Sequence, residues 1–179
     1  MNALANEEVG KYLNEHCISS FQKVGTFRIA GGQKQGGNVA SYFCTPEGNV
    51  LHIIAGPVNA STMLREARWA VETWKLTMLG EPERDYGRSL FHKAHLERLQ
   101  REHGVDGKRI GLPSGSASPA EIAYVLNQGI EGRRKLSNQG KVHLLLAIFP
   151  LAKLEQIYIP VFEKVLNEKV STLPVVGGG

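Results

Sequence analysis

Two short apolar runs within residues 38–57, separated by the turn-forming stretch 45–49, constrain the fold of this chain more than any other feature. Pro46 presets the φ angle of the second position of a turn, and Gly48 can adopt a positive φ. This arrangement predicts a β-hairpin. Beyond it, apolar residues recur with a helical period over residues 60–79. The unit is therefore expected to fold as strand, turn, strand and helix.

Helix-capping residues and apolar periodicity predict further helices. Ser118, followed by Pro119 and Glu121, is a strong helix start, with Ser as N-cap and Glu completing a capping box. The apolar run 142–149 fits either a buried helix or a buried strand. We interpret it as a helix because Ser137 can cap it. The predicted helices cover residues 7–14 with Asn6 as N-cap, 86–102, 119–129, 142–149, and 154–170 with a kink at Pro160.

Residues 17–30 mix Ile, Phe and Val with Ser and Thr, which predicts extended structure broken near Gly25. The glycine-rich stretch 31–37 follows. A phosphate-binding P-loop requires a Gly-Lys-Ser/Thr sequence that opens a helix, and this stretch lacks it. We therefore favour a flexible connection between strands over an anion site. The residues of the weaker alternative are Gly31, Gly32, Lys34, Gly36 and Gly37.

The composition is that of an ordinary globular protein. With 179 residues, 42% hydrophobic and 21% charged, the chain suits one large domain or one domain with an extension. The net charge of +4 is scattered apart from residues 133–135, which we interpret as a solvated face, so no nucleic-acid partner is expected. The N-terminus lacks a signal-peptide pattern, and no apolar run is long enough to span a bilayer. We expect a cytoplasmic protein without membrane contact.

Cysteine and histidine residues offer few candidates for chemistry. Cys17 follows His16, and an activated thiolate is one interpretation. A buried structural thiol is favoured for Cys17 and for Cys44, and whether the two pair stays open. His92 and His95 are spaced i, i+3 on a predicted helix and could share a metal ion. No motif supplies a third ligand, so packing or surface roles are favoured and no cofactor is predicted.

The stretches 8–18, 38–51 and 54–56, in this order and followed by a helix, resemble the later part of a thioredoxin-like domain. The resemblance covers about residues 6–77. It implies an α/β (α+β) fold in which the first stretch ends a helix and enters a central strand. The hairpin then adds two antiparallel strands, and the helix after it closes the domain.

The chain also departs from the thioredoxin-like pattern. The redox centre of that superfamily is a C-x-x-C motif, which residues 1–6 lack, and the first strand and the motif would lie upstream of Met1. The cis-proline position of the family corresponds to Val39. Without the first strand the sheet would have an unpaired edge, and exposed edges recruit partners. We expect a segment of the C-terminal half or a second subunit to cover this edge.

These observations predict two regions and a binding function. Residues 1–79 are expected to form the thioredoxin-like region, and residues 80–179 a helical extension packed on it. The expected function is that of a non-catalytic module that binds protein, with self-association as one form of that binding. The alternative is a thiol-dependent redox protein in which Cys17 or Cys44 reacts with a partner thiol.

Overall fold

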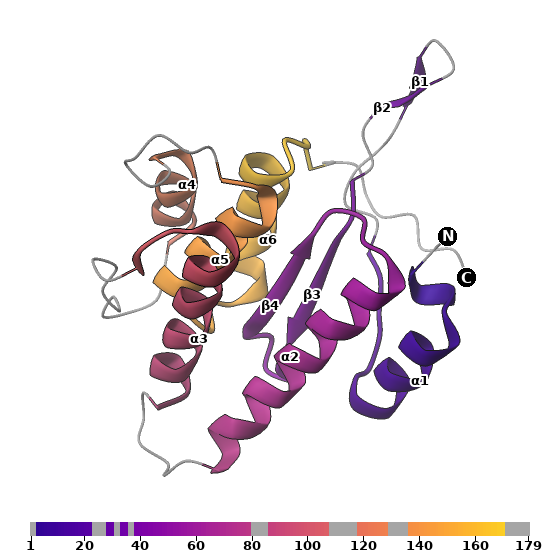
Figure 1. The fold of residues 1–179 in the computed structure, drawn as a ribbon. Coiled ribbons are helices and arrows are strands. Elements are labelled where there is room, and N and C mark those ends of the chain that lie inside the picture. Colours follow the sequence, from indigo (N-terminus) through magenta and orange to yellow (C-terminus); the bar gives the residue numbers. More distant parts are fainter. Residues whose placement is uncertain are drawn as a thin grey trace.

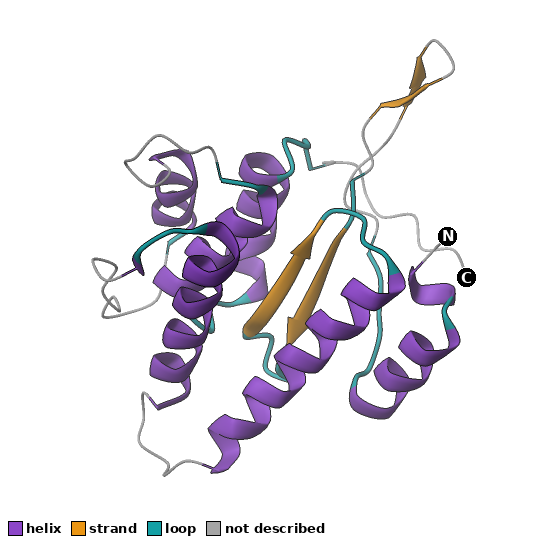
Figure 2. Ribbon diagram, in the orientation of Figure 1, coloured by secondary structure: helices purple, strands orange, loops and turns teal. Residues whose placement is uncertain are grey.

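The computed structural model describes residues 3–22, 28–30, 33–35, 38–79, 86–107, 118–128 and 136–170, with only the backbone described for 28–30 and 33–35. Helices and antiparallel strands make up an α+β fold. A β-hairpin lies at the centre with helices on either side of it (Figure 1). Figure 2, coloured by secondary structure, shows that helix predominates over strand.

The central hairpin consists of strands β3 (Ala40–Cys44) and β4 (Val50–Ala55), which pair antiparallel with Tyr42 opposite Ile53. Gly48 in the connecting turn has a φ of 79°, a conformation that favours glycine. The predicted strand, turn and strand are therefore confirmed.

The region predicted as extended forms strands only in part. Strands β1 (Arg28–Ala30) and β2 (Gln33–Gln35) pair as a second antiparallel hairpin. Residues 17–22 belong to no strand, so the prediction was wrong for them. Ile18 and Phe21 are 103% and 98% exposed, and no apolar burial favours a strand there. Of the candidate anion site, Lys34 lies in β2, whereas Gly31, Gly32, Gly36 and Gly37 lie outside the described residues.

The helices begin at the predicted caps. Asn6 Oδ1 accepts from the Val9 amide at 3.2 Å, and Ser137 Oγ accepts from the Gly140 amide at 3.1 Å. Ser118 forms the predicted capping box with its partner glutamate. After the 3₁₀ turn η1 (Ala3–Ala5), the helices are α1 (Glu7–His16), α2 (Ala60–Leu79), α3 (Tyr86–His103), α4 (Pro119–Gln128), α5 (Asn138–Ile148) and α6 (Leu154–Pro160).

The last helix is shorter than predicted. Helix α6 gives way after Pro160 to the π-helical turn η3 (Val161–Val165). Proline has no N–H to donate, and its ring crowds the preceding turn. The Leu166 amide bonds to the Val161 carbonyl at 3.0 Å, a spacing of five residues. Asn167, with a φ of 55°, then lies beyond the helical region, so the helical prediction was wrong after residue 165.

Strand β4 lies between two hydrophobic cores. Ile53 packs with apolar residues of α4, α5, α6 and η3. The next residue, Ile54, packs with Val9 of α1 and with Met63 and Leu64 of α2. Successive residues of a strand face opposite sides, so β4 can serve both cores. The first core joins the hairpin to helices far along the chain.

The two edge strands of the hairpin differ in whether another part of the chain hydrogen-bonds to them. Gln139 of α5 bonds to β4 as a neighbouring strand would: its Nε2 donates to the Ile53 carbonyl at 2.8 Å, and its Oε1 accepts from the Ala55 amide at 3.3 Å. The Val50 amide also donates to the Ala152 carbonyl at 2.8 Å. Among the described strands, β3 pairs with β4 alone.

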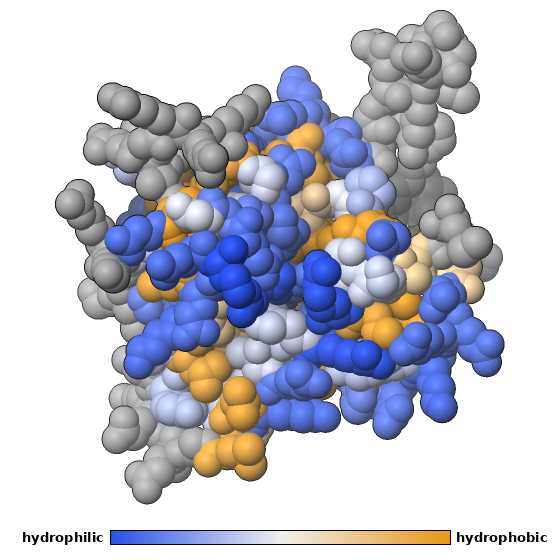
Figure 3. Space-filling view, in the orientation of Figure 1, coloured by the Kyte–Doolittle hydropathy of each residue, from blue (hydrophilic) through white to orange (hydrophobic). Residues whose placement is uncertain are grey.

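The surface carries apolar side chains at the C-terminal end of α2, where Leu76, Met78 and Leu79 are exposed. Figure 3 shows hydrophobic residues at this end of the molecule and further hydrophobic patches among the hydrophilic residues of the face in view. None of the helices within the described ranges is long and apolar enough to cross a membrane.

Candidate functional site

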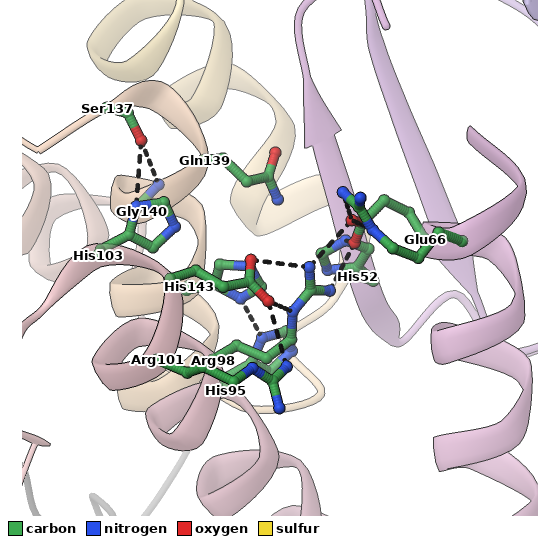
Figure 4. A network of polar contacts seen from close by, with 12 residues as sticks. His52, Glu66, His95, Arg98, Arg101, His103, Ser137, Gln139, Gly140 and His143 are labelled. Atoms are coloured by element: carbon green, nitrogen blue, oxygen red, sulfur yellow. Dashed lines mark hydrogen bonds and ion pairs between the residues drawn. The ribbon is translucent and has the colours of Figure 1, made fainter. Parts of the chain in front are cut away.

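A group of polar side chains is buried where β4, α2, α3 and α5 meet (Figure 4). Its most buried members are His52, Glu66, His95, Arg98 and His143, and none of them is more than 4% exposed. Burying polar and charged groups costs free energy unless each finds a partner. The hydrogen bonds of each polar atom in this cluster therefore show which atoms are free to bind a ligand.

Glu66 of α2 is the anionic centre of the cluster. Its carboxylate accepts from His52 Nε2 at 2.9 Å, from Arg98 Nη2 at 2.9 Å and from Arg65 Nη2 at 2.8 Å. Burial alone would raise the pKa of Glu66, but the hydrogen bonds from His52 and Arg98 outweigh it and hold this pKa well below the ordinary value. Glu66 is therefore ionised at neutral pH.

Arg98 of α3 links Glu66 to a second carboxylate. Its Nε donates to Glu102 Oε1 at 2.7 Å and its Nη2 to Glu102 Oε2 at 3.0 Å. The guanidinium also lies over the Trp69 ring, 4.9 Å from its centroid. Two carboxylates thus surround one buried guanidinium, and the exposed guanidinium groups of Arg65 and Arg101 also bond to them, so cations match both carboxylates.

The rings of His52, His95 and His143 lie together although they come from β4, α3 and α5. Their centroids are 5.8 Å apart for His52 and His95, 5.4 Å for His52 and His143, and 5.3 Å for His95 and His143. One ring nitrogen from each lies within 4.8 Å of the others. The two Nδ1 atoms of His95 and His143 are 3.0 Å apart.

The hydrogen bonds of His52 and His95 show that Nε2 of each ring carries the proton. His52 Nε2 faces the Glu66 carboxylate, which only accepts, so Nε2 carries the proton and Nδ1 has a lone pair. His95 Nε2 lies 3.0 Å from the Leu51 carbonyl, so it too carries the proton. The proton between His95 and His143 must then belong to His143 Nδ1.

This assignment leaves two buried lone pairs without a donor. His52 Nδ1 and His143 Nε2 are buried and have no hydrogen-bond partner among the residues the structure describes. His143 Nε2 lies 3.9 Å from Glu102 Oε2, another acceptor. Unsatisfied buried polar atoms are uncommon in folded proteins and call for an explanation.

Protonation does not supply the explanation. Burial lowers the pKa of His52, even though Glu66 opposes this effect. Burial, together with the neighbouring histidines, also lowers the pKa values of His95 and His143 well below the ordinary value. All three rings are therefore neutral at physiological pH, the form in which histidine binds metal ions.

The metal candidates proposed from sequence are separated by the structure. His95 lies inside the cluster, whereas His92 Nδ1 bonds to the Ala147 carbonyl at 2.7 Å. The sequence reasoning missed His52 and His143 as partners of His95. A signal was present, because each is a lone histidine within an apolar run that is predicted to be buried.

The redox candidates lie outside this cluster. Cys17 is the C-cap of α1 and Cys44 ends β3, and both are free thiols. Burial raises the pKa of Cys17, and it raises the pKa of Cys44 to about 11. Both shifts favour the thiol over the nucleophilic thiolate. Use of either residue in redox chemistry stays a prediction.

Comparison with known proteins does not name a family for this chain. No protein-family model, no curated protein and no solved structure matches it. The chemistry of the site itself is therefore the basis for a function.

Proposed function

We propose that this protein binds a divalent transition metal ion, with zinc as the first choice, through Nδ1 of His52, His95 and His143. The buried imidazole lone pairs described above are the observation that supports this function. An ion would take the place of the proton between His95 and His143. His143 would then carry its proton on Nε2, facing the Glu102 carboxylate, and every lone pair in the cluster would have a partner.

The spacing of the rings suits such an ion. Zinc–nitrogen bonds of about 2.0–2.1 Å at tetrahedral angles place ligand nitrogens about 3.3 Å apart and ring centroids roughly 5.2 Å apart. The Nδ1 atoms of His95 and His143 are 3.0 Å apart. The three centroid separations lie between 5.3 and 5.8 Å. Small ring movements would therefore complete the coordination.

The surroundings also resemble those of a metal site. Histidine ligands typically donate their other N–H to a carboxylate or a carbonyl, which fixes the ring and its tautomer. Glu66 has this position behind His52, and the Leu51 carbonyl has it behind His95. Glu102 Oε2 lies 3.9 Å from His143 Nε2, beyond hydrogen-bond distance.

A structural role for the ion agrees best with the burial of its ligands. His52, His95 and His143 are each at most 1% exposed, which leaves little room for a substrate. Since they come from three separate elements, the ion would hold β4 against α3 and α5. We therefore keep the proposal of a non-catalytic protein.

Zinc titration of the metal-free protein tests this function. Trp69 contacts the rings of His52 and His95, with centroids 5.0 and 4.9 Å away, so its fluorescence should report binding once Trp74→Phe removes the other indole. One equivalent of zinc should bind. His95→Gln should weaken binding by more than about 100-fold, beyond the loss typical of second-shell changes.

His92→Gln is the matched control, because His92 is a buried histidine on the same helix whose ring bonds only outside the cluster. It should keep the affinity of the wild type. A wild type that binds no zinc, or two variants with equal affinities, would refute the metal site and leave a hydrogen-bonded network alone.

We propose protein binding as a second function, in the form of self-association through β3. In support, β3 pairs with one strand among those described and holds no charged residue or proline, the usual protections of an edge. Ile18 and Phe21 are exposed apolar residues of the segment that the thioredoxin-like resemblance assigns to a neighbouring strand. A second copy of this chain is the proposed occupant.

Sedimentation velocity over a wide concentration range tests self-association. Phe21→Ser should weaken a concentration-dependent dimer, whereas Leu79→Ser, an equally apolar and exposed position at the end of α2, should not. A wild type that stays monomeric at all concentrations would contradict the second function without affecting the first.

A further inference from the structure

A second set of ligands lies on the outer side of His143. Atoms of Glu102, His103 and His143 approach within 4.8 Å of one another. His103 Nε2 is buried and, like His143 Nε2, has no hydrogen-bond partner within the described part of the chain. The Glu102 side chain is 30% exposed, so this group of atoms is closer to solvent than the three-histidine cluster.

We propose that Glu102, His103 and His143 form a second, solvent-facing site for the same class of divalent transition metal ions. The ligands are His103 Nε2, His143 Nε2 and a carboxylate oxygen of Glu102. This inference rests on the proposed function, because the outer site shares His143 with the inner one. Imidazole nitrogen and carboxylate oxygen together suit zinc and its neighbours in the first transition row.

The environment of His103 is compatible with the tautomer that would bind an ion at the outer site. Ser137 Oγ accepts from the Gly140 amide at 3.1 Å and lies 3.4 Å from His103 Nδ1. In the tautomer with the proton on Nδ1, His103 donates to this oxygen and its lone pair lies on Nε2; in the other tautomer the Ser137 hydroxyl donates to Nδ1. Gly140 lets α5 approach this closely, since a Cβ at that position would lie 3.2 Å from the His103 ring.

The single proton of neutral His143 connects the two sites. In the arrangement described, this proton lies on Nδ1 between His143 and His95, which leaves Nε2 free for an ion at the outer site. An ion at the inner site requires the proton on Nε2 instead. His143 therefore serves one site at a time, unless filling both releases its last proton to solvent.

This competition makes the outer site a loading position. An ion from solvent reaches Glu102 and His103 first and binds without any change of tautomer. It then moves to Nδ1 of the buried rings as the His143 proton shifts from Nδ1 to Nε2. The outer site is the weaker one, because the guanidinium groups of Arg98 and Arg101 bond to Glu102 at 2.7 and 3.2 Å and oppose a second cation.

Histidine variants in two backgrounds test the outer site with zinc as the probe. His95→Gln removes a ligand of the inner site and should leave only weak zinc binding at the outer site. The zinc affinity of the double variant His95→Gln/His103→Gln should be at least about tenfold lower again. His103→Gln alone should slow zinc uptake in stopped-flow mixing at least about tenfold. Circular dichroism and thermal unfolding without metal confirm that each variant folds.

The outcomes separate this inference from the proposed function. If the wild type binds one zinc ion but His95→Gln binds none, the inner site stands and the outer site is refuted. The outer site is also refuted if His95→Gln and the double variant bind zinc equally, or if His103→Gln takes up zinc at the rate of the wild type. Failure of the wild type itself to bind zinc would overturn the proposed function first.

Discussion

Strand β4 contacts its helices through two kinds of interface, and they differ in what each side chain requires. In the apolar core, Ile53 packs within a cluster of many apolar residues. In the polar cluster, His52 and Arg98 each depend on the same carboxylate, Glu66. Substitutions in apolar packing lower the stability gradually. Loss of one member of a buried polar network leaves its partners without hydrogen bonds, and the loss of stability is larger.

The largest effect should follow loss of Glu66. Glu66→Gln removes the charge that balances buried Arg98, and breaking one partner of a buried pair costs about 3–5 kcal/mol. Urea denaturation measures this change in the free energy of unfolding. Glu72→Gln, on the exposed face of the same helix, should change it by less than about 0.5 kcal/mol. Equal losses in the two variants would show that the cluster tolerates change as the apolar core does.

Zinc should stabilise the protein through the cluster alone. At a free concentration a hundredfold above its dissociation constant, a ligand of the native state adds about 2.7 kcal/mol to the free energy of unfolding. Thermal unfolding with and without zinc should show this gain in the wild type. The gain should disappear in His95→Gln when the free zinc concentration is held at the wild-type value. A gain preserved in that variant would place the ion elsewhere.

A substitution in the apolar core should lower the stability without altering the effect of zinc. Ile53 is fully buried, and Ile53→Val should cost about 0.5–1.5 kcal/mol by urea denaturation in the absence of metal. The stabilisation by zinc should be unchanged, because Ile53 packs into the apolar core on the face of β4 opposite to His52. Loss of the zinc effect in this variant would mean that the two interfaces are coupled.

The last effect depends on pH and concerns Cys44, which packs against the apolar core. Burial raises its pKa from 9.0 to about 11, so between these values the unfolded chain has lost a proton that the native chain keeps. Stability should therefore fall modestly as the pH rises from about 9 to 11. Alkylation by iodoacetamide at pH 8 should also be roughly 100-fold slower for native than for denatured Cys44. Equal rates would contradict this shift.

Most of the fold follows from local features of the sequence. Asn6, Ser118 and Ser137 cap helices where the pattern predicted them, and the turn at Gly48 joins the predicted strands. These signals act between residues a few positions apart, which is why they can be read directly. The segment 17–22 was mispredicted because its strand propensity needs a neighbouring strand to take effect.

The candidate site could be predicted only in part. The sequence identified His95 as a possible ligand but paired it with His92, since spacing along one helix is all that sequence shows. His52 and His143 join His95 through the packing of β4, α3 and α5, which no local pattern encodes. The carboxylates that fix the ring tautomers depend on the same packing.

The contacts of Gln139 set the direction in which chains could associate. Its amide pairs with Ile53 and Ala55 and closes the β4 side of the hairpin, while the opposite side faces no strand among those described. A sheet that can be extended from one side only cannot polymerise by strand addition. If the protein self-associates as proposed, two copies meeting through their open sides would form a closed pair with twofold symmetry, and Gln139 would block strand addition on the β4 side.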